Sequence, residues 1–432
     1  SSNSRMADSA TNSDSRRTTM QWKSYQSVAA GSDAIPATAK KDPYQWCVVG
    51  AGPAGIATVG LLLDSCVPPE SIAWIDPDFK VGDFGTKWKH VSSNTTVGLF
   101  LKFYQNCSSF DFSASASTKP YAIQSIPEKH TCLLDVAAEP LHDITRVLRS
   151  KIPNFQATVQ HLKERNAVWE CSLTSSSSAW SDSDSTSRKI SAANVVLATG
   201  AIPRTLPFHT TTTTTTLGCG SVVDVIPMTV ALNPNLLTAS IESSDTVAVF
   251  GSSHSAVMLI RHLLELTPAK KVINFYREPL RYALYMGDWI LFDDTGLKGD
   301  TARWSREHLH GDLPDRLQRV YSDKSVARYL PDCNKVIYAT GFERKLIPEG
   351  IEGLAPDFSY NAHCGIIAPG LFGCGIGYPE QRTDRFGNVE MRVGLWKFMD
   401  YLQGVIPLWK EYSVSQGIGQ PKGAPGTERK SS

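Results

Sequence analysis

The sequence predicts an α/β protein in which parallel strands alternate with helices, and three observations lead to this prediction. A short apolar strand, a Gly-rich turn and an apolar helix follow one another twice, first from Trp46 and again from Thr246. Two further β-branched strands each end in Ala-Thr-Gly. The chain has 432 residues, more than the length at which one hydrophobic core stops growing, so we expect two domains.

The first unit combines a glycine turn with an acidic residue at the end of the next strand. Its parts are a strand at 46–49, the turn GAGPAG at 50–55, a helix to about residue 63 and a strand at 71–75 that ends at Asp76. An acid at this position would accept a hydrogen bond from a ribose hydroxyl. The unit therefore predicts a dinucleotide site, and the alternative is a purely structural glycine turn.

Each residue of the first turn has a physical role in binding a pyrophosphate. Gly50 permits the tight turn, Gly52 lets backbone amides approach the phosphates, and Gly55 allows the helix to contact the strand. Pro53 and Ala54 begin the helix, whose N-terminal end carries partial positive charge toward the phosphates.

The second unit repeats this arrangement with a basic residue in the acidic position. Its parts are a strand at 246–250, the turn GSSHSA at 251–256, a helix at 257–266 and a strand at 272–276 that ends at Arg277. Arg277 follows Gly251 by 26 residues, as Asp76 follows Gly50. An arginine can pair with a ribose 2′-phosphate, so NADPH is favoured over NADH. The alternative is a solvated surface charge.

The second turn departs from the full glycine pattern. Gly251 and Ala256 are in place, but Ser253 stands where the middle glycine is expected. A serine still leaves a small side chain near the phosphates, so the site is retained as a prediction. His254, inside this turn, is expected to cap or pack the start of the helix.

The two Ala-Thr-Gly segments place the units in a known order. They are VVLATG at 195–200, with Thr199 and Gly200, and VIYATG at 336–341, with Thr340 and Gly341. Along the chain, each glycine turn is followed by one ATG segment. This order of four motifs resembles that of the two-dinucleotide-binding-domain flavoproteins, over about residues 45 to 412. The resemblance implies a Rossmann-like FAD domain with an inserted Rossmann-like NADPH domain, and thus FAD and NADPH as cofactors.

The predicted domains follow from this order. They are a disordered N-terminal extension at 1–44, the first part of the FAD domain at 45–220, the NADPH domain at 221–330, the second part of the FAD domain at 331–415 and a disordered tail at 416–432. The Ser-rich stretch 174–187 and the threonine run 210–216 are interpreted as surface loops.

The cysteine pattern argues against the disulfide-reductase branch of this superfamily. None of the nine cysteines forms a CxxC or CxxxxC pair, which those enzymes use beside the flavin. They also end the FAD domain with Gly-Asp, whereas Gly375 is followed here by Ile376. Both departures favour another branch.

Other motifs resemble flavin-containing and N-hydroxylating monooxygenases. Gly85 and Trp88 resemble their Gly-x-x-Trp, Ser93-Asn94-Thr95 resembles their Asn-Thr segment, and 332–348 resembles the ATG segment of the N-hydroxylating enzymes. The resemblance implies that Trp88 lies over the flavin and that Asn94 is catalytic, hydrogen-bonding a flavin C4a-(hydro)peroxide. The alternative for Asn94 is an Asx turn that opens a helix. The Phe-x-Gly-x-x-x-His motif of flavin-containing monooxygenases has no match.

The resemblance implies an FAD-dependent oxidoreductase that takes hydride from NADPH, reacts with O2 and oxygenates a small organic substrate. Two alternatives stay open: an NADPH oxidoreductase or oxidase without oxygen transfer, and a catalytically decayed flavin-binding sensor or scaffold, which Ser253 supports. An aromatic and acidic insertion at 282–304 is interpreted either as a substrate-facing segment or as ordinary surface structure.

Composition excludes several classes of partner. Lys plus Arg number 43 and Asp plus Glu 42, so no overall field favours nucleic acid. The longest apolar stretch holds the first glycine turn, so no integral membrane span is expected. Scattered cysteines indicate reduced thiols and predict an intracellular, cytoplasmic location. No metal site is expected, and the oligomeric state stays open.

Overall fold

The computed structural model describes residues 43–175, 188–206, 210–211, 214–216 and 222–417. Contacts divide the chain into Ser1–Lys40, which lies outside the described residues, and Lys41–Ser432, which contains all of them. The predicted N-terminal extension, most of the Ser-rich stretch and most of the predicted tail fall outside the described residues.

The first sheet has a parallel centre in the order β3-β2-β1-β5-β18. β4 pairs antiparallel with the second part of β3, at 157–165, and with the first part of β5, at 188–192. β17 pairs antiparallel with β18. The strands are β1 Tyr44–Val49, β2 Ile72–Asp76, β3 Asn154–Arg165, β4 Val168–Ser175, β5 Arg188–Leu197, β17 Ile366–Ala368 and β18 Leu371–Gly373.

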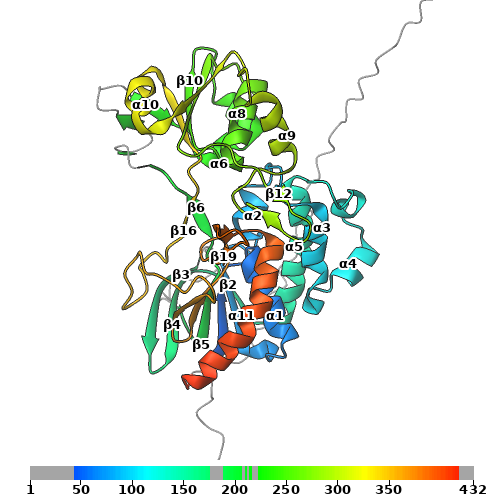
Figure 1. Ribbon diagram of the computed structural model, residues 1–432. Helices are drawn as coiled ribbons and strands as arrows, with labels where there is room; N and C mark the ends of the chain where they lie inside the picture. The colour runs from blue at the N-terminus through cyan, green and yellow to red at the C-terminus, as the bar shows by residue number, and fades with distance from the viewer. Residues whose placement is uncertain (1–42, 176–187, 207–209, 212–213, 217–221, 418–432) are drawn as a thin grey trace, which may run out of the picture. The chain divides into compact units, whose positions relative to one another are not determined.

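Both faces of this sheet are buried, because neighbouring residues along a strand point to opposite sides. Trp46 and Val48 of β1 pack with the helices, whereas Cys47 and Val49 pack against the strands around β4. Helices α1, α3, α5 and α11 contact one another over the first face (Figure 1). The helices of this half are α1 Pro53–Asp64, α2 Gly82–Thr86, α3 Val97–Gln105, α4 Phe112–Thr118, α5 Leu134–Lys151 and α11 Leu395–Ser415.

The second sheet repeats the parallel plan in the order β14-β11-β10-β15-β9, and β8 and β7 extend it antiparallel. Its strands are β7 Thr210–Thr211, β8 Thr214–Thr216, β9 Val222–Val225, β10 Thr246–Phe250, β11 Lys271–Tyr276, β14 Leu317–Tyr321 and β15 Lys335–Tyr338. Its helices are α6 Met228–Ala231, α7 Pro234–Ala239, α8 His254–Leu266, α9 Gly299–His308 and α10 Ser322–Tyr329. The predicted α/β class is confirmed, as are the four strands expected around the glycine turns.

Three two-stranded ribbons complete the strands of the described residues. They are β6 Ala201–Pro203 with β16 Phe342–Arg344, β12 Leu284–Tyr285 with β13 Ile290–Leu291, and β19 Glu380–Thr383 with β20 Val389–Arg392. β6 follows β5 and leads to the second sheet, and β16 follows β15 and leads back. The two crossings of the chain are therefore paired with each other.

The sheet memberships differ from the sequence analysis at two places. β15 pairs with β10 and β9, although residues 331–415 were assigned to the same half as the first turn. The described threonines 210–211 and 214–216 form strands β7 and β8 rather than a loop, with β8 paired to β9 and β7 paired to β8, in keeping with the high strand propensity of β-branched threonine. The second sheet thus begins before residue 221 and ends at Tyr338.

Candidate active site

The first glycine turn lies between β1 and α1, and two of its glycines are required by the fold itself. Gly50 has φ +109°, and a Cβ there would lie 2.3 Å from the carbonyl oxygen of Ala198. A Cβ on Gly55 would lie 2.0 Å from the carbonyl oxygen of Gly50. A Cβ on Gly52 would meet nothing within 4 Å. Only Gly52 faces open space, where a ligand can approach the backbone.

Asp76, at the end of β2, holds this turn from the side. Its carboxylate accepts backbone N–H bonds from Ala51 at 2.7 Å, Asp78 at 3.0 Å and Phe79 at 2.7 Å. Burial raises the pKa of Asp76, and these N–H donors oppose that rise. A carboxylate has about four acceptor positions, so three bonds leave one position for a ribose hydroxyl.

The second turn, between β10 and α8, has the same backbone geometry. Gly251 has φ +128°, and a Cβ there would lie 2.3 Å from the carbonyl oxygen of Ala339. The buried Ala256 packs beneath it, since the two Cβ positions would be 3.3 Å apart. Ser253 directly precedes α8 and is exposed. Serine is therefore compatible with an open turn.

Arg277 directly follows β11 and is exposed. Within the described part of the chain, no hydrogen bond or ion pair engages its guanidinium. The nearby Arg281 instead stacks over Phe292, with 4.7 Å from Cζ to the ring centroid. Of the two arginines, Arg277 is the one left available to a ligand.

The two Ala-Thr-Gly segments bond crosswise to the paired crossings of the chain. The Thr199 hydroxyl donates to the Lys345 carbonyl at 3.1 Å, and the Thr340 hydroxyl donates to the Arg204 carbonyl at 2.8 Å. Backbone bonds repeat the exchange, from Lys345 N to Gly200 O at 3.0 Å and from Arg204 N to Gly341 O at 2.9 Å. Gly200 and Gly341 have positive φ, of 78° and 91°. These four predicted residues thus fix the crossings.

Trp88 and Asn94 follow the first unit. The Trp88 ring packs edge-on against Phe342 of β16, with centroids 5.9 Å apart. Asn94 is exposed, and its Oδ1 lies 3.4 Å from the Thr95 hydroxyl. The adjoining Ser93 is buried, and its hydroxyl donates to the Thr95 carbonyl at 2.6 Å. The local turn therefore presents the Asn94 amide outward.

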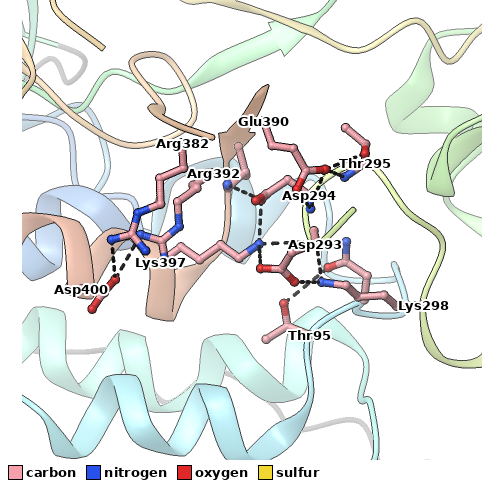
Figure 2. Close-up of polar contacts among 12 residues, drawn as sticks. Thr95, Asp293, Asp294, Thr295, Lys298, Arg382, Glu390, Arg392, Lys397 and Asp400 are labelled. Carbon is pink, nitrogen blue, oxygen red and sulfur yellow. Dashed lines mark hydrogen bonds and ion pairs between the residues drawn. The ribbon is translucent and has the colours of Figure 1, made fainter. Parts of the chain in front are cut away.

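An ionic cluster lies beside the Asn94 segment and joins the insertion to β20 and α11 (Figure 2). Lys397 Nζ lies 2.7 Å from Asp293 Oδ2 and 2.7 Å from Asp294 Oδ1, and Lys298 pairs with Asp293 on its other oxygen. Burial opposes ionisation of Asp293, but Lys397 and Lys298 outweigh it and hold its pKa below the usual range. A Cβ on Gly394 would lie 3.8 Å from Lys397 Cδ and 4.0 Å from Thr95 Oγ1. This cluster has no signature in the sequence, because its residues come from segments about 100 positions apart.

Comparison with known proteins decides the family. No model of a protein family matches the chain. The chain is 33% identical over 394 residues to the monooxygenase AgnR1 of Paecilomyces divaricatus, covering 84% of this chain and 97% of that relative. The chain belongs to the same family as this monooxygenase. The resemblance inferred from the four motifs is confirmed.

Solved flavoenzyme structures share the fold of this monooxygenase. An ornithine N-hydroxylase of Kutzneria sp. 744, solved with reduced FAD, NADP+ and L-ornithine, matches with a TM-score of 0.56 at 14% identity, covering 85% of this chain and 99% of that one. A flavin-containing monooxygenase of Stenotrophomonas maltophilia matches with 0.54 at 12%, covering 87% and 99%. An L-lysine 6-monooxygenase of Pseudomonas syringae matches with 0.54 at 15%, covering 85% and 99%.

Two glycines that contact the first turn of the monooxygenase are not predicted as site residues by the sequence. A Cβ on Gly82, at the start of α2, would lie 3.1 Å from Gly52 Cα, and one on Gly375 would lie 2.7 Å from Ala54 Cβ. Both glycines were visible as turn residues, but nothing local shows which turn they contact. His254 Nε2 lies 3.5 Å from the Thr301 hydroxyl, and burial lowers the pKa of His254 to about 4, so it packs the helix start as a neutral side chain.

In the part of the monooxygenase that the structure describes, His, Cys, Asp and Glu form no group of three or more suited to a metal ion. Among the same residues, no helix combines the length and the apolar character needed to cross a bilayer.

Proposed function

We propose that this monooxygenase binds FAD at the first glycine turn and NADPH at the second, and that it acts on a small organic substrate with O2. The observation that carries the proposal is the difference among the glycines of the first turn. Backbone contacts account for Gly50 and Gly55 without a ligand, but none accounts for Gly52. A glycine at an open, backbone-exposing position is what a pyrophosphate requires.

The remaining residues of the first turn fit an adenine dinucleotide. The N-terminus of α1 begins at Pro53 with no acidic residue in its first turn, so its partial positive charge is uncompensated. Asp76 keeps one acceptor position for a ribose hydroxyl. FAD, when bound, supplies the redox chemistry, since it accepts a hydride and activates oxygen.

The second site is proposed to take the phosphorylated nicotinamide cofactor. Arg277, at the end of β11, offers a guanidinium that no described residue engages, and α8 has no acidic residue in its first turn. The proposed NADPH-binding unit comprises the second sheet through β15, and the proposed FAD-binding unit comprises the first. In both, the cofactor lies at the carboxyl ends of parallel strands.

Asn94 is proposed as the group that contacts the reacting oxygen. Its Nδ2 donates no hydrogen bond to the described residues, and its Oδ1 is held only by the long contact to Thr95. A free amide N–H donor suits an oxygen atom that gains negative charge during transfer.

The test begins with the visible spectrum of the purified chain after incubation with excess FAD. We expect a bound flavin, bleaching by NADPH under anaerobic conditions, and slower bleaching by NADH. Reoxidation under ¹⁸O2 with a thioether, a primary amine and a cyclic ketone as probes should place ¹⁸O in at least one product. A colourless, folded protein would overturn the FAD site.

The same experiment separates the two alternatives. Rapid reoxidation that yields hydrogen peroxide and no labelled product with any probe would favour an oxidase. A flavin that NADPH does not reduce would favour a sensor or scaffold. Family membership favours the ¹⁸O-labelled product over both alternatives, because the AgnR1 relative is a monooxygenase.

A further inference from the structure

The middle of the insertion, at 293–295, is held by side chains that come from β20 and α11. Glu390 Oε1 accepts the Thr295 backbone N–H at 3.0 Å and the Thr295 hydroxyl at 2.6 Å. Asp294 Oδ1 accepts the Val393 N–H at 3.0 Å and pairs with Lys397. We name Asp293, Asp294, Thr295, Glu390 and Lys397 the anchor.

The anchor is protected from water at its centre. The side chain of Asp294 is 6% exposed, that of Lys397 is 14% exposed, and Glu390 is buried. Ion pairs in such surroundings are screened little by salt, and removing one partner leaves the other charge unpaired. The anchor therefore fixes its two segments more firmly than a surface ion pair does.

Helix α9 connects the anchor to the second glycine turn. Lys298, which pairs with Asp293, directly precedes α9. Further along α9, Trp304 Nε1 donates to Glu265 of α8 at 2.6 Å, and Thr301 Oγ1 lies 3.5 Å from His254 Nε2. A shift of the insertion would therefore move the helix that begins at the second turn.

The other side of α9 touches the support of the Asn94 segment. A Cβ on Gly299 would lie 3.2 Å from Thr131 Cγ2, and the neighbouring Cys132 carbonyl accepts the Ser93 N–H at 2.8 Å. On the same helix, Thr301 Oγ1 lies 3.5 Å from His254 Nε2 in the second turn. The second turn and the Asn94 segment thus share one set of contacts, which the anchor holds in place.

We infer that Asp294 is a positioning residue for hydride transfer: by anchoring the insertion to β20 and α11, it aligns the second glycine turn with the Asn94 segment. The inference rests on the proposed function, in which these two places hold NADPH and face the flavin. Hydride transfer is sensitive to misplacement of about 1 Å, so a loosened anchor should slow it without removing either cofactor.

The test compares Asp294→Asn with wild type in three measurements. In cofactor-free protein, hydrogen exchange should become faster in peptides covering 292–298 and 390–397. In FAD-loaded protein, anaerobic flavin reduction at saturating NADPH should be about tenfold slower, while FAD content and NADP+ affinity change less than about threefold. The isotope effect with NADPH deuterated at the transferred position should shrink, because alignment becomes limiting.

Asp288→Asn is the matched control. Asp288 lies in the turn of the β12–β13 ribbon and Arg385 in the turn of the β19–β20 ribbon. Their ion pair therefore also joins the insertion to the β19–β20 ribbon, but its side chains are 71% and 61% exposed. We expect this variant to match wild type in all three measurements. Equal slowing in Asp288→Asn, or unchanged reduction and exchange in Asp294→Asn, would overturn the inference.

Two further arms keep the test decisive. If Asp294→Asn does not fold, Thr295→Val removes one anchor hydrogen bond with little change of shape and carries the same three measurements. If wild type binds no FAD or is not reduced by NADPH, the proposed function is wrong. The anchor is still tested in that case, because hydrogen exchange is measured in cofactor-free protein.

Discussion

The side-chain amide of Asn274 donates a hydrogen bond of 2.8 Å to the carbonyl oxygen of Gly251, the first residue of the second glycine turn. The first half of the molecule has an equivalent, since Trp74 Nε1 donates to the Gly50 carbonyl at 3.0 Å. In both halves a buried side chain on the neighbouring strand fixes the carbonyl of the leading glycine. An indole and an amide thus perform the same structural task.

This relationship predicts the effect of Asn274→Leu. The substitution removes the bond to Gly251 and a second one to the Val249 carbonyl at 3.0 Å, and it leaves Arg319 Nε without its acceptor. We expect the free energy of unfolding to fall by about 2–4 kcal/mol, and NADP+ to bind more weakly. Urea unfolding and fluorescence titration measure the two effects. Unchanged NADP+ affinity in a folded variant would contradict a role in the turn.

Alanine at Gly50 should lower the stability of the fold, whereas alanine at Gly52 should lower the affinity for FAD. Gly50→Ala places a Cβ 2.3 Å from the Ala198 carbonyl oxygen at φ +109°, so we expect a loss of more than about 3 kcal/mol of stability. Gly52→Ala meets no protein atom within 4 Å, so the fold should be kept while FAD affinity falls at least about tenfold. Thermal unfolding and flavin content measure both variants. Normal FAD binding in Gly52→Ala would remove the first turn from the cofactor site.

Arg277→Glu should raise the KM for NADPH by about 10–100-fold and change that for NADH much less, because only NADPH carries the 2′-phosphate. Stability should hardly change, since Arg277 is exposed. Lys270→Glu, at the opposite end of β11, makes the same charge change on an exposed residue and serves as the control. Equal effects of both variants on the KM for NADPH would indicate a long-range electrostatic effect rather than a specific contact of Arg277 with the 2′-phosphate.

His254 should make the protein sensitive to acid. Burial, aided by the charge of Lys298, lowers its pKa to about 4, below the ordinary value of the unfolded chain. As pH falls from about 6.5 to about 4, the unfolded state takes up a proton that the folded state does not, so stability decreases. Between about pH 7 and pH 4.5 we expect wild type to lose about 2–3 kcal/mol more than His254→Gln. Denaturant unfolding at both pH values checks this, and equal losses would show that His254 is not buried as a neutral group.

Much of the fold could be predicted because its signals are local. The strands at 46–49 and 246–250, the turns that follow them and the residues at which the next strands end were all read from short patterns, and the structure has β1, β2, β10 and β11 there. Gly50 and Gly251 needed no partner to be identified, since their positive φ is a property of the turn itself. For the candidate site, these local patterns identify the residues themselves but not the distant residues that they contact.

Tertiary structure alone decided which distant segments meet. β15 carries an ATG segment like that of β5, yet only its pairing with β10 shows that it belongs to the second sheet. The three backbone donors that occupy Asp76, and the contact of Asp294 with Lys397 across 103 residues, likewise have no local signature. Turn geometry depends on the φ and ψ of a few adjacent residues, whereas these contacts depend on how whole sheets and helices pack.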